Sequence, residues 1–135
     1  MKIKSTFVVA MTIIVLSVPS WAHHSVSQIF NADKATTLTG VLTKIEWINP
    51  HMSVFMDVKD ASGKVVNWHI EFAPLNTLSA KGIDKKTLDL VSTYVIDVWP
   101  ARNGSAYATG RTLTLPNGRK LDVADSLYWQ SSEKR

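Results

Sequence analysis

The chain has 135 residues, of which 45% are hydrophobic and 19% are charged, and this is the composition of one globular domain of ordinary size. It excludes two full domains, and with only 6 glycines and 5 prolines it also excludes a collagen-like or disordered chain. The formal net charge is +4, and there is no cysteine. The chain therefore has no disulfide bond and no thiolate metal site.

The first 22 residues have the pattern of a secretory signal peptide. Two lysines precede an apolar stretch at residues 7–18 that is too short to span a bilayer, and Ser20-Trp21-Ala22 then supplies a small-residue cleavage site. We expect cleavage after Ala22 and a periplasmic or secreted mature protein without a membrane span. Cleavage after Trp21 and an uncleaved N-terminal anchor are the alternatives.

Removal of residues 1–22 leaves 113 residues with 13 basic and 11 acidic side chains, a net charge of +2. No stretch concentrates lysine and arginine among aromatic residues, so nucleic acid is not a predicted partner. A small ligand or another envelope protein is the expected partner class, and the oligomeric state stays open. We predict an N-terminal segment over residues 23–35, one β-domain over 36–125 and a C-terminal tail over 126–135.

The β-domain is predicted from short alternating stretches separated by turns. In the first strand, residues 36–48, Val41, Thr43, Ile45 and Trp47 share one face, and Gly40 inside the strand indicates a bend or bulge. Residues 51–60 and 65–72 then form a hairpin. The residues expected to face the core in its first strand are Met52, Val54, Met56 and Val58. One face of its second strand carries Val66, Trp68, Ile70 and Phe72.

One short helix is predicted over residues 73–81, because Pro74 suits its first turn and Gly82 suits the position after its end. Further strands are expected at residues 93–99, 107–115 and 120–123. The fold class is therefore all-β with one short helix. The order of elements favours a small five- to six-stranded antiparallel barrel of the OB type over a β-sandwich, which has no place for the helix.

Several short motifs carry a resemblance to a known family. They are His23-His24-Ser25, residues 37–41, the string from Glu46 to His51, residues 57–60 with Gly63-Lys64, Asn67-Trp68 with Glu71, and residues 117–120. Together they resemble the DUF6152 family of small exported bacterial proteins without an assigned function. Trp47-Ile48-Asn49-Pro50-His51 and the His-His start are the most specific. The resemblance implies an exported protein with this fold and supplies no activity; the chain departs from the pattern between Lys85 and Tyr94.

A metal site is the first functional prediction. After cleavage at Ala22, His23 offers a free α-amine and an imidazole nitrogen, which together chelate one Cu(II) ion, and His51 or His24 supplies a further imidazole. We therefore predict metal ligands at His23, His24 and His51, with copper as the candidate cofactor. The alternatives are a solvated chain end with adventitious affinity and, for His51, a structural hydrogen bond to a loop carbonyl or Glu46.

A metal-independent binding module is the second prediction. Trp47, Asn49 and Arg102 lie in or beside loops that would line one barrel rim, where a ring and hydrogen-bond donors recognise a small ligand or a protein. Core packing is the alternative for Trp47. No catalytic residue is predicted, because the chain has no P-loop, no G-x-S-x-G and no H-E-x-x-H motif. A third reading is an envelope accessory protein without a discrete site.

Overall fold

A computed structural model of the chain describes residues 25–126. The elements are α2 (Ser25–Ile29), η3 (Ala32–Lys34), β1 (Thr36–Glu46), β2 (Ser53–Lys59), β3 (Val65–Glu71), α3 (Leu75–Ala80), β4 (Thr93–Pro100), β5 (Tyr107–Thr114) and β6 (Lys120–Asp122). The predicted signal peptide, His23, His24 and nearly all of the C-terminal tail lie outside the described residues. Within that range, no helix has the length and apolar character needed to cross a membrane.

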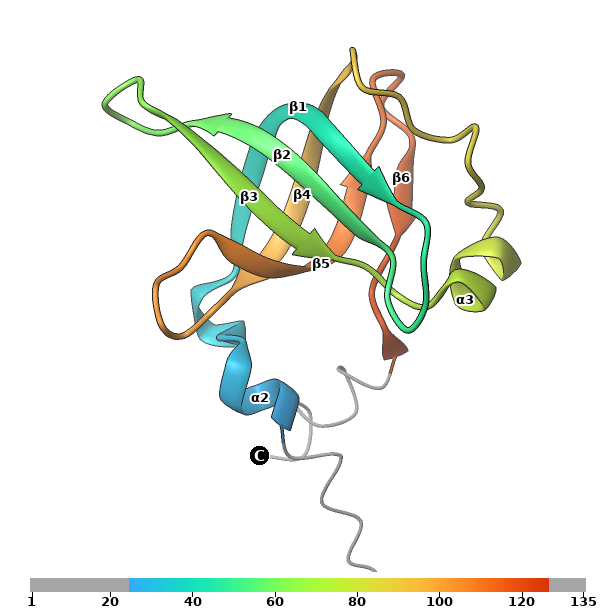
Figure 1. Cartoon of the computed structure of the whole chain (residues 1–135), viewed down its shortest axis with the longest axis horizontal. Helices are drawn as coiled ribbons and strands as arrows, with labels where there is room; N and C mark the ends of the chain where they lie inside the picture. The colour runs from blue at the N-terminus through green and yellow to red at the C-terminus, as the bar shows by residue number, and fades with distance from the viewer. Residues whose placement is uncertain (1–24, 127–135) are drawn as a thin grey trace, which may run out of the picture.

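The strands form a closed five-stranded barrel (Figure 1). β1 pairs antiparallel with β2 and with β4, β2 pairs with β3, and β4 pairs with β5. A short parallel pairing between β3 and β5 closes the ring, and β6 extends β5 as a sixth strand. The structure confirms the predicted OB-like barrel, with the parallel β3–β5 contact as the one exception to its antiparallel character.

The barrel core is built from alternate residues of its strands, as a strand's twofold side-chain period requires. Met52, Val54 and Met56 are fully buried, so the predicted core face of β2 is confirmed. Ile70 and Phe72 are buried on the predicted face of β3, and Trp68 packs partly buried against them. The other strands add Leu38, Leu42, Tyr94, Ile96, Val98, Ala108 and Leu113.

β1 departs from simple alternation, because a bulge between Leu42 and Lys44 shifts its pairing with β2. Leu42 is buried before the bulge, whereas Ile45 and Trp47 pack against the core after it. One inserted residue moves every following side chain to the other face of the strand. The prediction that Val41 and Ile45 share a face is therefore wrong, although the predicted irregularity in this strand is present.

Two segments cover the lower end of the barrel in Figure 1. α3 follows β3 where it was predicted, and its Leu78 is fully buried. The N-terminal segment attaches through Phe30, which is 3% exposed and forms a bridge with Ala101. The N–H of Asn31 donates to the carbonyl oxygen of Pro100 at 2.9 Å. The described part of the N-terminal segment is thus packed onto the strand that it contacts.

Candidate functional site

His51 lies in the β1–β2 connection at the lower end of the barrel. The connection turns at Asn49–Pro50, whose peptide bond is cis. Two backbone hydrogen bonds then hold it against the end of β3: the N–H of Met52 donates to Ala73 at 3.4 Å, and the N–H of Phe72 donates to Met52 at 2.7 Å. Because these hydrogen bonds hold the backbone of Met52, the next residue in the chain, the His51 side chain projects from a backbone in a fixed position.

The imidazole of His51 lies between two carboxylates. Its Nε2 atom is 3.1 Å from Oδ2 of Asp125, and its Nδ1 atom is 3.8 Å from Oε2 of Glu71. The His51 side chain is 25% exposed, that of Glu71 is 21% exposed, and that of Asp125 is 7% exposed. Glu46, the carboxylate considered in the sequence analysis, forms its ion pair with Lys44 at 2.5 Å.

Asp125 follows β6 and is held in place by the backbone around it. The N–H of Val123 donates to the carbonyl oxygen of Arg111, and Val123 in turn accepts from Ala73. The ammonium group of Lys81 contacts the carbonyl oxygen of Ala124 at 3.3 Å. A carboxylate on such a rigid and buried backbone fixes the orientation of the imidazole that it binds.

These three side chains do not converge on one point. Asp125 and Glu71 approach opposite nitrogens of the His51 ring, so an ion between His51 and Glu71 lies on the far side of the ring from Asp125. In agreement with this arrangement, residues 25–126 contain no group of three histidine or acidic side chains that could hold a metal ion. The described structure supplies two convergent donors at most, and His23 and His24 lie outside it.

The three residues predicted for a barrel-rim site have separate contacts. Trp47 is half-buried against the core. Asn49 accepts a hydrogen bond from the N–H of Leu75 at 3.3 Å, which ties it to the start of α3. The Arg102 guanidinium donates through Nε to the carbonyl oxygen of Ser27 at 2.8 Å, which ties it to α2. α3 and α2 lie apart in Figure 1, so Asn49 and Arg102 are held by two separate segments at the lower end of the barrel.

The sequence analysis missed a row of rings on the outer surface of the barrel. Phe55 of β2 stacks on His69 of β3 with ring centres 4.7 Å apart and planes within 7°, and Tyr107 of β5 follows at 5.0 Å. His69 also contacts the Ser53 hydroxyl at 3.0 Å. Because the rings face one another across three strands, they stabilise the barrel wall.

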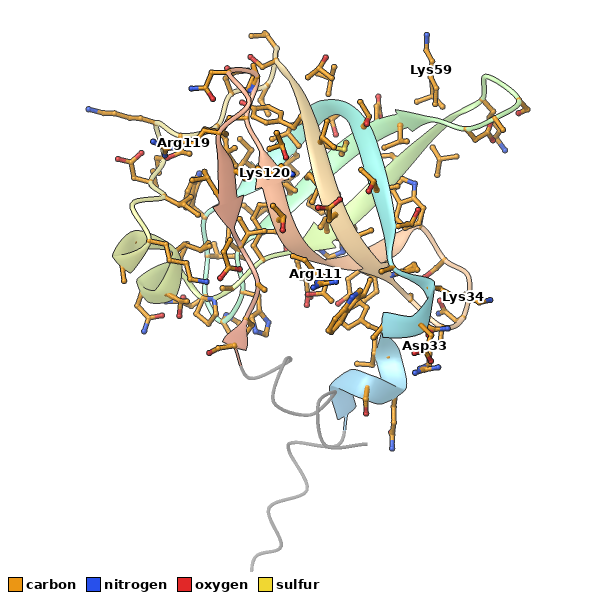
Figure 2. The ribbon with its side chains drawn as sticks, turned by 180° about the vertical axis from the view of Figure 1, so that it is seen from behind. Asp33, Lys34, Lys59, Arg111, Arg119 and Lys120 are labelled. Atoms are coloured by element: carbon orange, nitrogen blue, oxygen red, sulfur yellow. The ribbon has the colours of Figure 1, made fainter. Side chains whose placement is uncertain are left out.

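The opposite face carries a shallow polar hollow of about 220 Å³. It is lined by Ala35, Thr36, Thr37, Asp97, Arg111 and Thr112. The Thr37 hydroxyl donates to Asp97 at 2.7 Å, and the Arg111 guanidinium lies 4.9 Å from the Trp99 ring centre. Figure 2 shows Arg111 near the middle of this face and Lys34, Lys59 and Arg119 at three separate edges, so these cations do not gather around the hollow.

Comparison with known proteins gives one match. The model of a family described as "Family of unknown function (DUF6152)" matches residues 10–111. The chain belongs to this family, and the resemblance found in its motifs is confirmed. No curated protein and no solved structure shows significant similarity to the chain.

Proposed function

We propose that this member of the DUF6152 family is an exported protein that binds a metal ion, with copper as the first candidate, through His23 at the mature N-terminus together with His51 or His24. The observation that carries the proposal is the hydrogen bond between His51 and the buried carboxylate of Asp125. Histidines that bind metals commonly donate their second ring N–H to a carboxylate, which orients the ring and raises its basicity.

The position of the N-terminal segment supports the same proposal. α2 begins at Ser25, and it lies at the same end of the barrel as the β1–β2 connection that carries His51 (Figure 1). His23 is two residues before Ser25, and two extended residues span about 7 Å. Cleavage after Ala22 would create a free amine and an imidazole two residues before this helix.

The proposed metal site depends on export, because removal of the signal peptide creates one of its ligands. The α-amine of His23 becomes a ligand only if the bond after Ala22 is cut. Mass spectrometry of the protein purified from the envelope fraction of its host tests this step, and a mature mass beginning at His23 is expected. A mature chain that begins at Ala22 or retains residues 1–22 removes the amine–imidazole chelate.

Copper titration of the mature protein tests the site itself. The affinity for Cu(II), measured by competition with a coloured chelator, is expected to fall at least about tenfold in His51→Ala and in a form with one extra residue before His23. His69→Ala is the matched control, since His69 is also half-buried on the barrel but contacts Ser53 and two rings. If Cu(II) binds weakly and His51→Ala has the same affinity as the wild type, the metal binds only to the chain end, and the binding is adventitious.

The metal-independent alternative, a ligand- or protein-binding module near Trp47 and Arg102, has weaker support. Arg102 is engaged with Ser27 through its side chain and with Ile29 through its backbone N–H. Trp47 contributes part of its surface to the core. Two results together would favour this alternative. Adding metal would leave the stability and the binding partners of the protein unchanged, and Trp47→Ala would abolish binding to those partners.

A further inference from the structure

The first half of β3 has an unpaired edge. On one side, β2 pairs with β3 over its whole length, from Val65 to Glu71. On the other side, β5 pairs only with residues 69–71. Within residues 25–126 no strand pairs with this second side of residues 65–68, and the hairpin that carries them projects from the barrel in Figure 1. Residues 65–68 therefore form an open strand edge.

The backbone groups of Val65 and Asn67 point to this open edge. The carbonyl oxygen of Lys64 accepts from the N–H of Asp60, so the even-numbered residues direct their backbone groups toward β2. The N–H of His69 donates at 3.0 Å to the loop before β5, on the other side. The pairing of β3 with β2 has no bulge, so backbone groups alternate between the two sides along the strand. Two N–H groups and two C=O groups are thus available at the edge.

The side chains beside this edge leave it accessible. Val65 is 50% exposed. The Asn67 side chain turns toward the neighbouring strands, where its Nδ2 atom donates to Asp57 at 2.7 Å and to Thr43 at 3.0 Å. Residues 65–68 contain no charged residue and no proline, which natural proteins use to prevent pairing at a strand edge. The partner that fits such an edge is an extended strand, because a strand presents N–H and C=O groups at the same spacing.

We propose that the partner is β3 of a second copy of this chain, paired antiparallel about a twofold axis at Val66. In this register Val65 lies opposite Asn67 of the second copy, and Asn67 lies opposite Val65 of the second copy. All the available backbone groups of both copies are then paired, in four hydrogen bonds. A register centred on Asn67 pairs fewer of them, because it places Val65 opposite His69, whose N–H is already bonded.

The proposed contact is small, so the dimer is weak. Lys64 lies opposite Trp68 of the second copy, where a lysine ammonium group stabilises an indole ring by a cation–π interaction. The edge nevertheless has only four residues in each copy, well below the about 20 to 30 residues per side of a stable complex. We therefore expect a Kd of about 0.1 to 1 mM. The dimer does not depend on the metal-binding function proposed above.

Analytical ultracentrifugation of the mature protein at about 0.05 to 2 mM, with a chelator present, tests for the dimer. Val65→Pro is expected to abolish it, because proline lacks the N–H that faces the edge, whereas the first position of an edge strand tolerates proline. Val65→Thr is the matched control: it keeps the N–H, and its Kd is expected to stay within about fivefold of the wild type. A wild type that stays monomeric at the highest concentration, or a Val65→Pro variant that is folded and still dimeric, overturns the proposal.

Single cysteines test the register without a proline variant. The chain has no cysteine, so a disulfide in a single-cysteine variant joins two copies. In the proposed register the Cα atoms of the two Val66 residues are about 4.5 Å apart, within disulfide range, whereas those of the two Val65 residues are about 8 Å apart. In a glutathione buffer, Val66→Cys is therefore expected to form linked dimers at least about tenfold faster than Val65→Cys. Equal rates, or a faster rate for Val65→Cys, would contradict the proposed pairing.

Discussion

His51 and Asp125, which are 74 positions apart in the sequence, are joined by a hydrogen bond of 3.1 Å between Nε2 and Oδ2. This bond fastens the segment after β6 to the β1–β2 connection. We predict that Asp125→Ala lowers the free energy of unfolding by about 2 kcal/mol, because it removes a charge-assisted hydrogen bond to a half-buried ring. Asp125→Asn keeps an acceptor oxygen and is expected to lose less. Urea unfolding followed by tryptophan fluorescence measures both; equal losses would contradict an acceptor role.

Gly40 is required by the close crossing of β1 over β2. A Cβ atom at this position would overlap the carbonyl oxygen of Asp57, which belongs to the backbone and cannot move aside. We predict that Gly40→Ala lowers the free energy of unfolding by about 3 kcal/mol or prevents folding. Gly63→Ala is the control: Gly63 has open space around it and a φ of +83°, so only the backbone cost of about 1 kcal/mol applies. Equal effects of the two substitutions would refute this explanation.

The ring of His69 supports the place where the barrel closes. β3 and β5 pair only from His69 to Glu71, and the row of Phe55, His69 and Tyr107 crosses this contact. We predict that His69→Ala costs about 1 kcal/mol of stability. Hydrogen exchange at residues 107–109 is expected to accelerate more than exchange in the β1–β2 pairing. A uniform acceleration in all strands would mean that the row has no special role in closure.

Arg102 is expected to influence metal binding without being a ligand. Its Nε donates to Ser27 and its backbone N–H donates to Ile29, so it holds α2 on the barrel. We predict that Arg102→Ala increases proteolysis within residues 25–35 and reduces Cu(II) affinity by about three- to tenfold, because a loosened segment lowers the effective concentration of His23 near His51. Lys34→Ala, on the same segment, is the control. Faster proteolysis with unchanged affinity would show that the position of α2 does not matter for binding.

Asp89 makes part of the stability depend on pH. The backbone N–H groups of Val91 and Ser92 donate to its carboxylate and lower its pKa below the usual 3.8. The contribution is therefore complete above about pH 5 and is lost as the pH falls through the lowered value. We predict that the wild type exceeds Asp89→Ala in unfolding midpoint by a constant amount from pH 5 to 7, and that this difference shrinks at pH 3. A difference that grows on acidification would contradict the assignment.

Much of the fold follows from local patterns in the sequence. The alternation of Met52, Val54 and Met56 predicts a half-buried strand, and the structure buries these side chains completely. Pro74 and Gly82 mark the two ends of the short helix, and Gly82 has the positive φ of +76° expected after a helix. Such signals are local because strand period, turns and helix ends depend on neighbouring residues.

The candidate site was only partly predictable, because its contacts are long-range. His51 was selected for its place after Asn49-Pro50, but no local pattern indicates that Asp125 returns to it from the end of β6. Glu71 attracted attention only as part of a family motif, because its approach to His51 depends on the course of the β1–β2 connection. The reversal of faces in β1 was missed for a related reason: Gly40 indicated an irregularity, while the pairing shift occurs after Leu42.

The bridge between Phe30 and Ala101 also makes the docking of the N-terminal segment depend on residues about 70 positions later in the chain. Phe30 and the first strand find their partners on β4, since Thr36 pairs with Val98 and Phe30 with Ala101. Contacts between distant parts of a chain form only after the intervening segment is available, and they slow folding. During synthesis the N-terminal segment and β1 therefore cannot form these contacts with β4 and Ala101 until about residue 100 has been added. The β1–β2 and β2–β3 pairings need no residue beyond 71, so only the docking of the N-terminal segment and the closure of the barrel depend on this later part of the chain.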